Sequence, residues 1–182
     1  MYMTFNRNRF ICLGLSLAML GMVVLAGCRA ERFRSFTVGL STPSGNHIYV
    51  ERVVFDNEWW AAGGDINCCW EQAGSATGIF DKRMPRMARV RWHQLKEGMS
   101  YEATVQLGED LARQARKMPG YTRISDGRKF KDSPTLVVGM RPDGQVVVWL
   151  TNARSENNVR GRVLHVVGEA QAVAGPSGVP LQ

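Results

Sequence analysis

The sequence predicts a mainly β protein of the α+β class, with an antiparallel sheet or sandwich of about seven or eight strands and one helix packed on one side. Three observations support this prediction. Apolar and polar residues alternate with a period of two along several segments. Turns containing glycine or proline separate those segments. Only one segment has helical spacing, so the regular β–α alternation of a parallel sheet is missing.

Three strands are predicted near the start of the domain. Apolar and small or polar residues alternate over 36–41, and the Pro-Ser-Gly-Asn sequence at 43–46 is typical of a turn. Residues 47–55 are rich in β-branched and aromatic side chains, and a third strand begins at Trp59. The glycine-rich segment 63–78 contains neither common phosphate-binding motif, so we expect it to be a tight structural turn.

The clearest pattern is a hairpin over residues 88–107, in which two alternating segments flank the Lys-Glu-Gly sequence at 96–98. The predicted register places three pairs opposite each other: Gln94 with Met99, Arg91 with Glu102, and Trp92 with Tyr101. The same alternation places His93 on the polar face of its strand, where we expect it to be exposed to solvent.

One helix is predicted over residues 108–118. Leu111, Ala115 and Met118 recur at helical spacing, with acidic residues before them and basic residues toward the end, as the helix dipole favours. The Pro-Gly sequence at 119–120 ends the helix. A polar, basic loop is predicted after it, from Tyr121 to Ser133.

The last part of the domain contains a second hairpin. Strands are predicted at 136–140 and 146–150 on either side of an Arg-Pro-Asp-Gly turn. The second of these strands lacks alternation, which predicts a position inside a sheet that is covered on both faces. A polar loop at 152–158 and a strand at 159–167 follow, and we expect residues 169–182 to be disordered.

The sequence Leu-Ala-Gly-Cys at 25–28 follows a basic start and an apolar run that begins at Phe10. The run would form about 24 Å of helix, which is short for a bilayer core of about 30 Å. A retained signal anchor and a secretory signal cut at another position are the alternatives. The pattern resembles the bacterial lipoprotein signal, which implies that residues 1–27 are removed and that Cys28 is lipidated.

This resemblance also implies a location. Residue 29 is Arg, whereas Asp at that position retains lipoproteins at the inner membrane, so we expect an outer-membrane protein facing the periplasm. The predicted organisation is a lipidated tether at 28–34, a single globular domain at 35–168 and the disordered tail. The chain has a formal net charge of +7. For an envelope protein this favours contact with anionic lipid or an acidic protein over nucleic acid.

Cys68 and Cys69 are adjacent, in a compartment that permits disulfide bonds. Their Cα atoms can be only about 3.8 Å apart across a trans peptide, whereas most disulfides need 4.4 Å or more. A vicinal disulfide, two packed thiols and a bond to another chain remain open. We expect a structural role, with at least one of the two side chains buried; too few further ligands accompany the pair for a metal site.

Two passages resemble a family of Gram-negative lipoproteins classified as a domain of unknown function, DUF2931. They are Trp59–Trp70 with the strand at 89–92, and the hairpin Leu136–Leu150. The resemblance implies a shared fold but no chemistry, because these are core and turn residues. Some lipoproteins of this general kind look like immunity proteins, which neutralise lipases that rival bacteria deliver into the periplasm.

No catalytic motif is visible: the chain lacks G-x-S-x-G, and its three histidines are isolated in the sequence. We therefore expect no enzyme, no cofactor and no metal, and interpret the protein as a protein-binding module, with a structural or assembly lipoprotein as the alternative. Arginine and aromatic residues are common anchors of binding surfaces. Tyr121, Arg123, Arg128 and Lys129 are the predicted partner-binding residues, together with the 152–158 loop.

Overall fold

The computed structural model describes residues 32–131 and 133–177, so Cys28 and the predicted signal lie outside the described residues. The described chain forms thirteen strands and one helix in three sheets, more strands than predicted, because several are only two to four residues long. The elements are β1 (Phe33–Ser41), β2 (Ile48–Phe55), β3 (Trp59–Ile66), β4 (Ser75–Lys82), β5 (Met87–Gln94), β6 (Met99–Gln106), α2 (Leu111–Lys117), β7 (Tyr121–Arg123), β8 (Lys129–Phe130), β9 (Thr135–Met140), β10 (Gln145–Thr151), β11 (Val159–Arg160), β12 (Leu164–Gln171) and β13 (Val173–Pro176).

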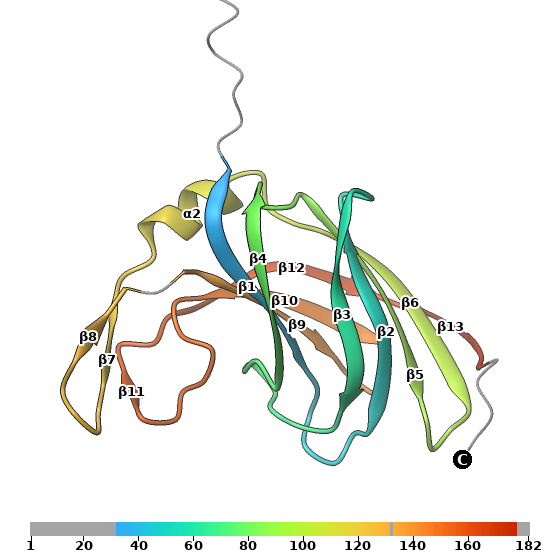
Figure 1. The fold of residues 1–182 in the computed structure, drawn as a ribbon. Helices are drawn as coiled ribbons and strands as arrows, with labels where there is room; N and C mark the ends of the chain where they lie inside the picture. The colour runs from blue at the N-terminus through green and yellow to red at the C-terminus, as the bar shows by residue number, and fades with distance from the viewer. Residues whose placement is uncertain (1–31, 132, 178–182) are drawn as a thin grey trace, which may run out of the picture. The chain divides into compact units, whose positions relative to one another are not determined.

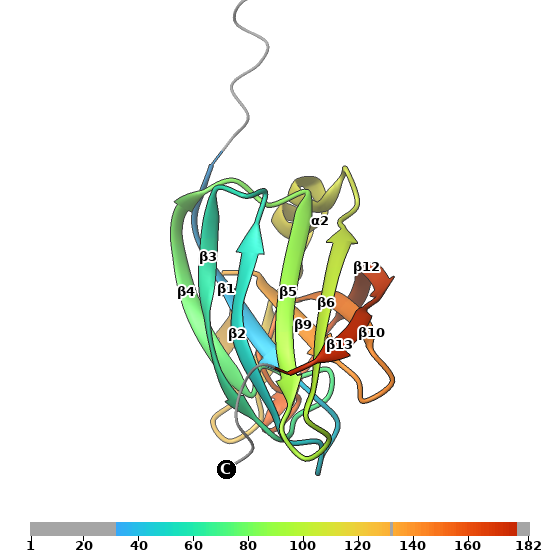
Figure 2. The same ribbon diagram turned by 90° about the vertical axis from the view of Figure 1, so that its right-hand side faces the viewer.

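Two five-stranded sheets form the two layers of a sandwich, as Figure 2 shows. The strand orders are β12-β10-β9-β1-β4 and β13-β6-β5-β2-β3, and the third, smaller sheet is β11-β7-β8. The main hydrophobic core lies within residues 36–150 and includes Phe36, Phe55 and Trp92, which are at most 1 % exposed. The described residues therefore form a hydrophobic core of their own.

Both predicted hairpins are confirmed. In the β5–β6 pair, Gln94, Arg91 and Trp92 lie opposite Met99, Glu102 and Tyr101, as predicted, and the Trp92 and Tyr101 rings stack with centroids 5.2 Å apart. Strand β10 pairs with β9 and β12 and is buried on both faces. The sheets are mainly antiparallel, but β1 and β9 form a parallel pair.

The helix begins at Leu111, later than predicted, so Glu109 precedes it and Asp110 stands at its N-cap. Its buried residues Leu111 and Ala115 belong to the main core. Figure 1 shows α2 at the end of the sandwich where β1 begins and β4 ends. The helix thus closes this end of the core.

The end of the chain differs most from the prediction. Residues 169–176 were expected to be disordered, yet they complete β12 and form β13, which pairs with β6. The predicted strand at 159–167 is divided between β11 and β12. Gly168 in β12 allows the chain to pass close to β6, because a Cβ at this position would lie 2.6 Å from the Gln106 carbonyl oxygen. The chain can therefore cross closely from one sheet to the other.

Candidate functional site

The two predicted binding segments lie together in one lobe, which we define as residues 121–131 and 152–161. Residues 121–133 were predicted to be a loop, but β7 and β8 form a hairpin there, and β11 pairs with β7. Residues 152–158 contain no strand, so the predicted loop there is confirmed. The strands are two or three residues long, too short for a period of two to reveal them. Figure 1 shows that the tip of the β7–β8 hairpin points away from the end where β1 begins.

Asn158 joins the two segments of the lobe. Its carbonyl oxygen accepts a hydrogen bond from the Ile124 amide at 2.8 Å, and its Oδ1 accepts one from the Ser125 amide at 2.8 Å. Its Nδ2 donates to Ser125 Oγ at 3.0 Å. The backbone of Asn158 has φ +61°, a left-handed conformation that asparagine tolerates better than most residues. The backbone and side chain of Asn158 together fix the 124–125 turn against the 152–158 loop.

Asn152 fixes the base of the lobe. It is 4 % exposed, and its Nδ2 donates to the carbonyl oxygens of Pro119 and Gly161 at 3.1 and 2.9 Å. Its Oδ1 accepts from the Val163 amide at 2.8 Å. Because each buried polar atom of the amide is paired, Asn152 holds the lobe to the sandwich without cost from unsatisfied groups.

Two of the four predicted binding residues stabilise the lobe itself. The Tyr121 and Phe130 rings stack with centroids 5.6 Å apart, and the Arg123 guanidinium lies 4.9 Å from the Phe130 centroid. Arg123 also forms a two-point ion pair with Asp126, in which Nε donates to Oδ1 at 3.0 Å. The hydrogen bond from Arg123 holds the pKa of the Asp126 carboxyl below its usual range.

The other two predicted residues, Arg128 and Lys129, are exposed on the lobe. The exposed apolar side chain there is Ile124, at 57 %. Further exposed cations are Lys131, Arg154 and Arg160, whereas the described acidic residues of the lobe are Asp126 and Glu156. The lobe therefore presents a positively charged surface with an apolar residue at its turn, which complements an acidic partner.

Cys68 and Cys69 are joined by a disulfide in the structure, with Cα atoms 3.7 Å apart. Both side chains are partly exposed, so the expectation that at least one is buried is wrong. Cys69 has φ +76°, and Ser41 Oγ donates to its carbonyl oxygen at 2.6 Å. The pair therefore lies in the connection from β3 to β4 and contacts the chain at the end of β1.

The segment that follows the disulfide covers the outer face of the β9–β10 pair. Trp70 packs edge-to-face on Trp149 at 4.8 Å, and the Arg141 guanidinium lies 4.7 Å from the Trp70 ring centroid. Beneath them is a second core cluster that includes Val137 and Val147. The disulfide segment therefore covers apolar side chains of β9 and β10, which is consistent with a structural role.

The same segment also supports the lobe. The Ala73 amide donates to the Arg154 carbonyl oxygen at 2.8 Å, and Ser155 Oγ donates to Gln72 Oε1 at 2.8 Å. Arg162 donates to the carbonyl oxygens of Glu71 and Ala153, and burial lowers the pKa of its guanidinium. Nothing in the sequence pattern indicated this contact, because seven strands and one helix separate the two segments in the chain.

His93 is buried, so its predicted exposure is wrong. It is 2 % exposed, with Nε2 2.7 Å from Glu51 Oε1 and Nδ1 2.8 Å from Ser177 Oγ. A serine, a histidine and a carboxylate thus lie in a row, but the Ser177 amide donates to the Gly98 carbonyl oxygen and ties the end of β13 to the β5–β6 turn. We interpret the arrangement as a structural contact of the C-terminal strand.

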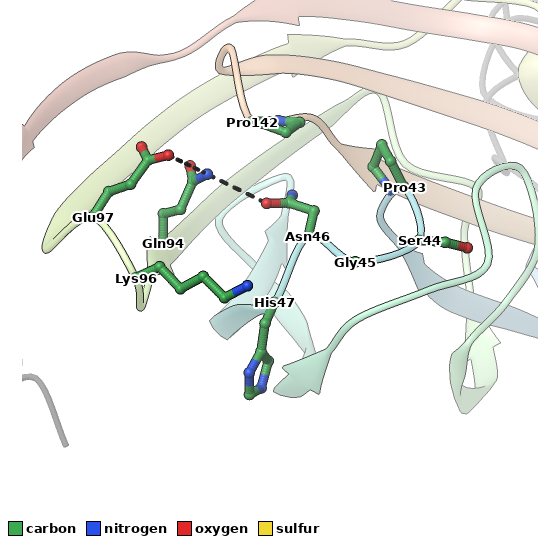
Figure 3. Close-up of a pocket in the computed structure, with 9 residues that line it drawn as sticks. All are labelled: Pro43, Ser44, Gly45, Asn46, His47, Gln94, Lys96, Glu97 and Pro142. Atoms are coloured by element: carbon green, nitrogen blue, oxygen red, sulfur yellow. Dashed lines mark hydrogen bonds between the residues drawn. The ribbon is translucent and has the colours of Figure 1, made fainter.

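A shallow hollow of about 350 Å³ lies between the turn at 43–47 and the turn at 94–97 (Figure 3). Gln94 Nε2 donates to Asn46 Oδ1 at 3.3 Å and to Glu97 Oε1 at 3.2 Å. Asn46 Nδ2 in turn donates to Thr42 Oγ1 at 2.7 Å. These polar side chains bind one another and stabilise the two turns.

Among residues 32–131 and 133–177, no group of three or more His, Cys, Asp or Glu side chains is placed to hold a metal ion. In the same residues no helix is long and apolar enough to cross a membrane.

Comparison with known proteins identifies the family of the chain. Neither the curated proteins nor the solved structures gave a match. A family model described as "Protein of unknown function (DUF2931)" matches residues 29–174, which include every strand except the last residues of β13. The chain therefore belongs to the DUF2931 family.

Proposed function

We propose that the protein is a lipoprotein of the bacterial envelope, anchored through Cys28 in the outer membrane and exposing its lobe to the periplasm. The support for the anchor is the Leu-Ala-Gly-Cys sequence at 25–28 after an apolar run, with Arg rather than Asp at position 29. Two or three acyl chains would hold the domain stably at the membrane, whereas one chain binds only marginally.

We further propose that the lobe binds another protein. The observation that carries this proposal is the lobe's construction: two distant segments are joined by Asn158, yet none of their residues belongs to either core cluster. An ordered surface with no role in the core is a common place for binding residues. Arg128, Lys129 and Ile124 supply the exposed charge and apolar surface that such contacts use.

The proposed partner is an acidic protein, and the strongest candidate is an antibacterial effector, such as a lipase, that enters the periplasm. Protection would come from covering the effector's active surface. An interface of ordinary size buries about 800 Å² on each partner, which a domain of this size can supply. The alternative is a structural or assembly lipoprotein, which would need no effector.

Metabolic labelling with palmitate tests the anchor. We expect the wild-type protein to take up the label and the Cys28→Ser variant to remain an unlabelled, longer precursor. Label that persists in the Cys28→Ser protein would contradict lipidation at this residue.

Co-purification from cells that encounter rival bacteria tests the partner. We expect one effector to be recovered with the wild-type protein and lost with Arg128→Glu/Lys129→Glu. The matched control is Arg52→Glu/Lys96→Glu, which changes two exposed cations outside the lobe by the same charge. Arg123 is left unchanged because it holds Asp126. A strain without the gene that survives rivals as well as its parent would remove the immunity hypothesis and favour the structural alternative.

A further inference from the structure

Cations surround the place where the chain enters the sandwich. Lys82 on β4 lies opposite Phe33, the first residue of β1, and the Arg116 guanidinium of α2 lies 5.1 Å from the Phe33 ring centroid. Arg32 Nη1 donates to the Asp81 carbonyl oxygen at 3.5 Å. We call this the entry end; Figures 1 and 2 show the start of β1, the end of β4 and α2 at this same end of the sandwich. Its basic residues are Arg32, Arg34, Lys82, Arg83, Arg86, Arg113, Arg116 and Lys117.

Acidic side chains are fewer at the entry end, and some are bound within it. Asp110 accepts hydrogen bonds from Arg113 at 2.7 Å and from Gln114 at 2.8 Å. Asp56 accepts from the backbone amides of residues 86 and 87, both at 2.9 Å. The other described acids at this end are Glu58, Asp81 and Glu109. The entry end therefore has an excess of positive charge.

An exposed aromatic side chain accompanies these cations. Phe80 is 68 % exposed on the edge strand β4, opposite Ser35 and two positions before Lys82. Its ring lies over Gly78, where a Cβ would be 3.3 Å away. An aromatic ring beside lysine and arginine is a typical combination at the interface between a bilayer and water.

We propose that the entry end docks on an anionic phospholipid surface. The placement of this end near a bilayer rests on the proposed lipidation of Cys28. Three residues lie between Cys28 and Arg32, so their Cα atoms can be at most about 14 Å apart, and the lipid would hold these cations close to the headgroups. Clusters of Lys and Arg beside an anchor bind anionic lipid in this way. The lobe, whose tip points away from the entry end, would then face the periplasm.

Vesicle sedimentation with the lipid-free chain that starts at Arg29 tests the docking surface; this chain contains all the core residues among 32–131 and 133–177. We expect binding to phosphatidylcholine vesicles that contain phosphatidylglycerol, weaker binding in high salt, and none to phosphatidylcholine alone. Lys82→Glu/Lys117→Glu should weaken binding at least about tenfold. Arg52→Glu/Lys96→Glu, which has the same net charge, should bind like the wild type. Phe80→Ser should also bind more weakly.

Equal losses in the two charge-reversal variants would overturn the proposal, because net charge and not this surface would then govern binding. Equal binding to both kinds of vesicle would overturn it as well. The melting temperature of each variant verifies that the domain is folded. Since the tested chain carries no lipid, these outcomes are separate from palmitate labelling, and failure of either experiment leaves the other intact.

Discussion

The Nε2 atom of His93 lies 2.7 Å from Oε1 of Glu51. The two residues lie in the β13-β6-β5-β2-β3 sheet, on its outer face, where the neighbouring residues Tyr49 and Arg91 are exposed. A bulge in β2 produces this pair: Val50 lies opposite Trp92 and Arg52 opposite Arg91, so Glu51 is an extra residue in its strand. On the other side of the ring, His93 Nδ1 lies 2.8 Å from Ser177 Oγ. The buried imidazole thus connects β2, β5 and the end of the C-terminal strand.

Replacing Glu51 should destabilise the domain. We expect Glu51→Ala to lower the free energy of unfolding by about 1–3 kcal/mol, because a buried ring nitrogen of His93 loses its partner. Urea denaturation measures this. Glu102→Ala removes an exposed carboxylate opposite Arg91 and should change stability by less than about 0.5 kcal/mol. Equal effects of the two substitutions would mean that the His93–Glu51 contact contributes little.

Gly63 should not tolerate a side chain. A Cβ there would lie 1.9 Å from the Val50 carbonyl oxygen and 2.5 Å from that of Glu51, so the bulge needs a residue without one. We expect Gly63→Ala to lower the free energy of unfolding by about 2–3 kcal/mol or to prevent folding. Ala62→Ser, at the exposed neighbouring position, is the control. A Gly63→Ala protein with the wild-type melting temperature would contradict this account of the bulge.

Removing the disulfide should loosen the segment that covers Trp149. In Cys68→Ser/Cys69→Ser we expect faster hydrogen exchange at the Ala73 amide, which binds the Arg154 carbonyl oxygen, and unchanged exchange at Val90 in the main core. Intact mass before and after reduction verifies the bond in the wild-type protein. If the Ala73 amide exchanges equally slowly in both proteins, the disulfide does not order this segment.

Asp126 should titrate at lower pH than an ordinary aspartate. Its pKa is lowered by the hydrogen bond from Arg123, so its contribution to lobe stability is complete above the unfolded-state pKa and is lost as the pH falls through the lower, folded-state pKa. Carboxyl ¹³C NMR measures the midpoint. In Arg123→Ala we expect the midpoint to return to the usual range, whereas Lys129→Ala should leave it low. An unchanged midpoint in Arg123→Ala would show that another group lowers this pKa.

The small sheet of the lobe illustrates why part of the candidate site could not be predicted. The polar composition of the two lobe segments distinguished them from the apolar core strands. It also predicted that Arg128 and Lys129 are exposed, as the structure has them. It did not indicate that Arg123 forms an ion pair with Asp126, or that Asn158 joins segments more than thirty positions apart. Short strands have too few residues for a periodic signal, and their pairing depends on contacts between distant segments.

The sequence alone determined the β-rich class, the two hairpins, the register of the β5–β6 hairpin and the core face of the helix, because these features depend on neighbouring residues. The β5–β6 register follows from the turn at 96–98 and local alternation, and the β9–β10 hairpin from the turn at 141–144. Only the tertiary structure decided the parallel pairing of β1 with β9, the return of β13 beside β6 and the burial of His93. Each of these depends on segments far apart in the chain, whose contacts form when the two sheets enclose a common core.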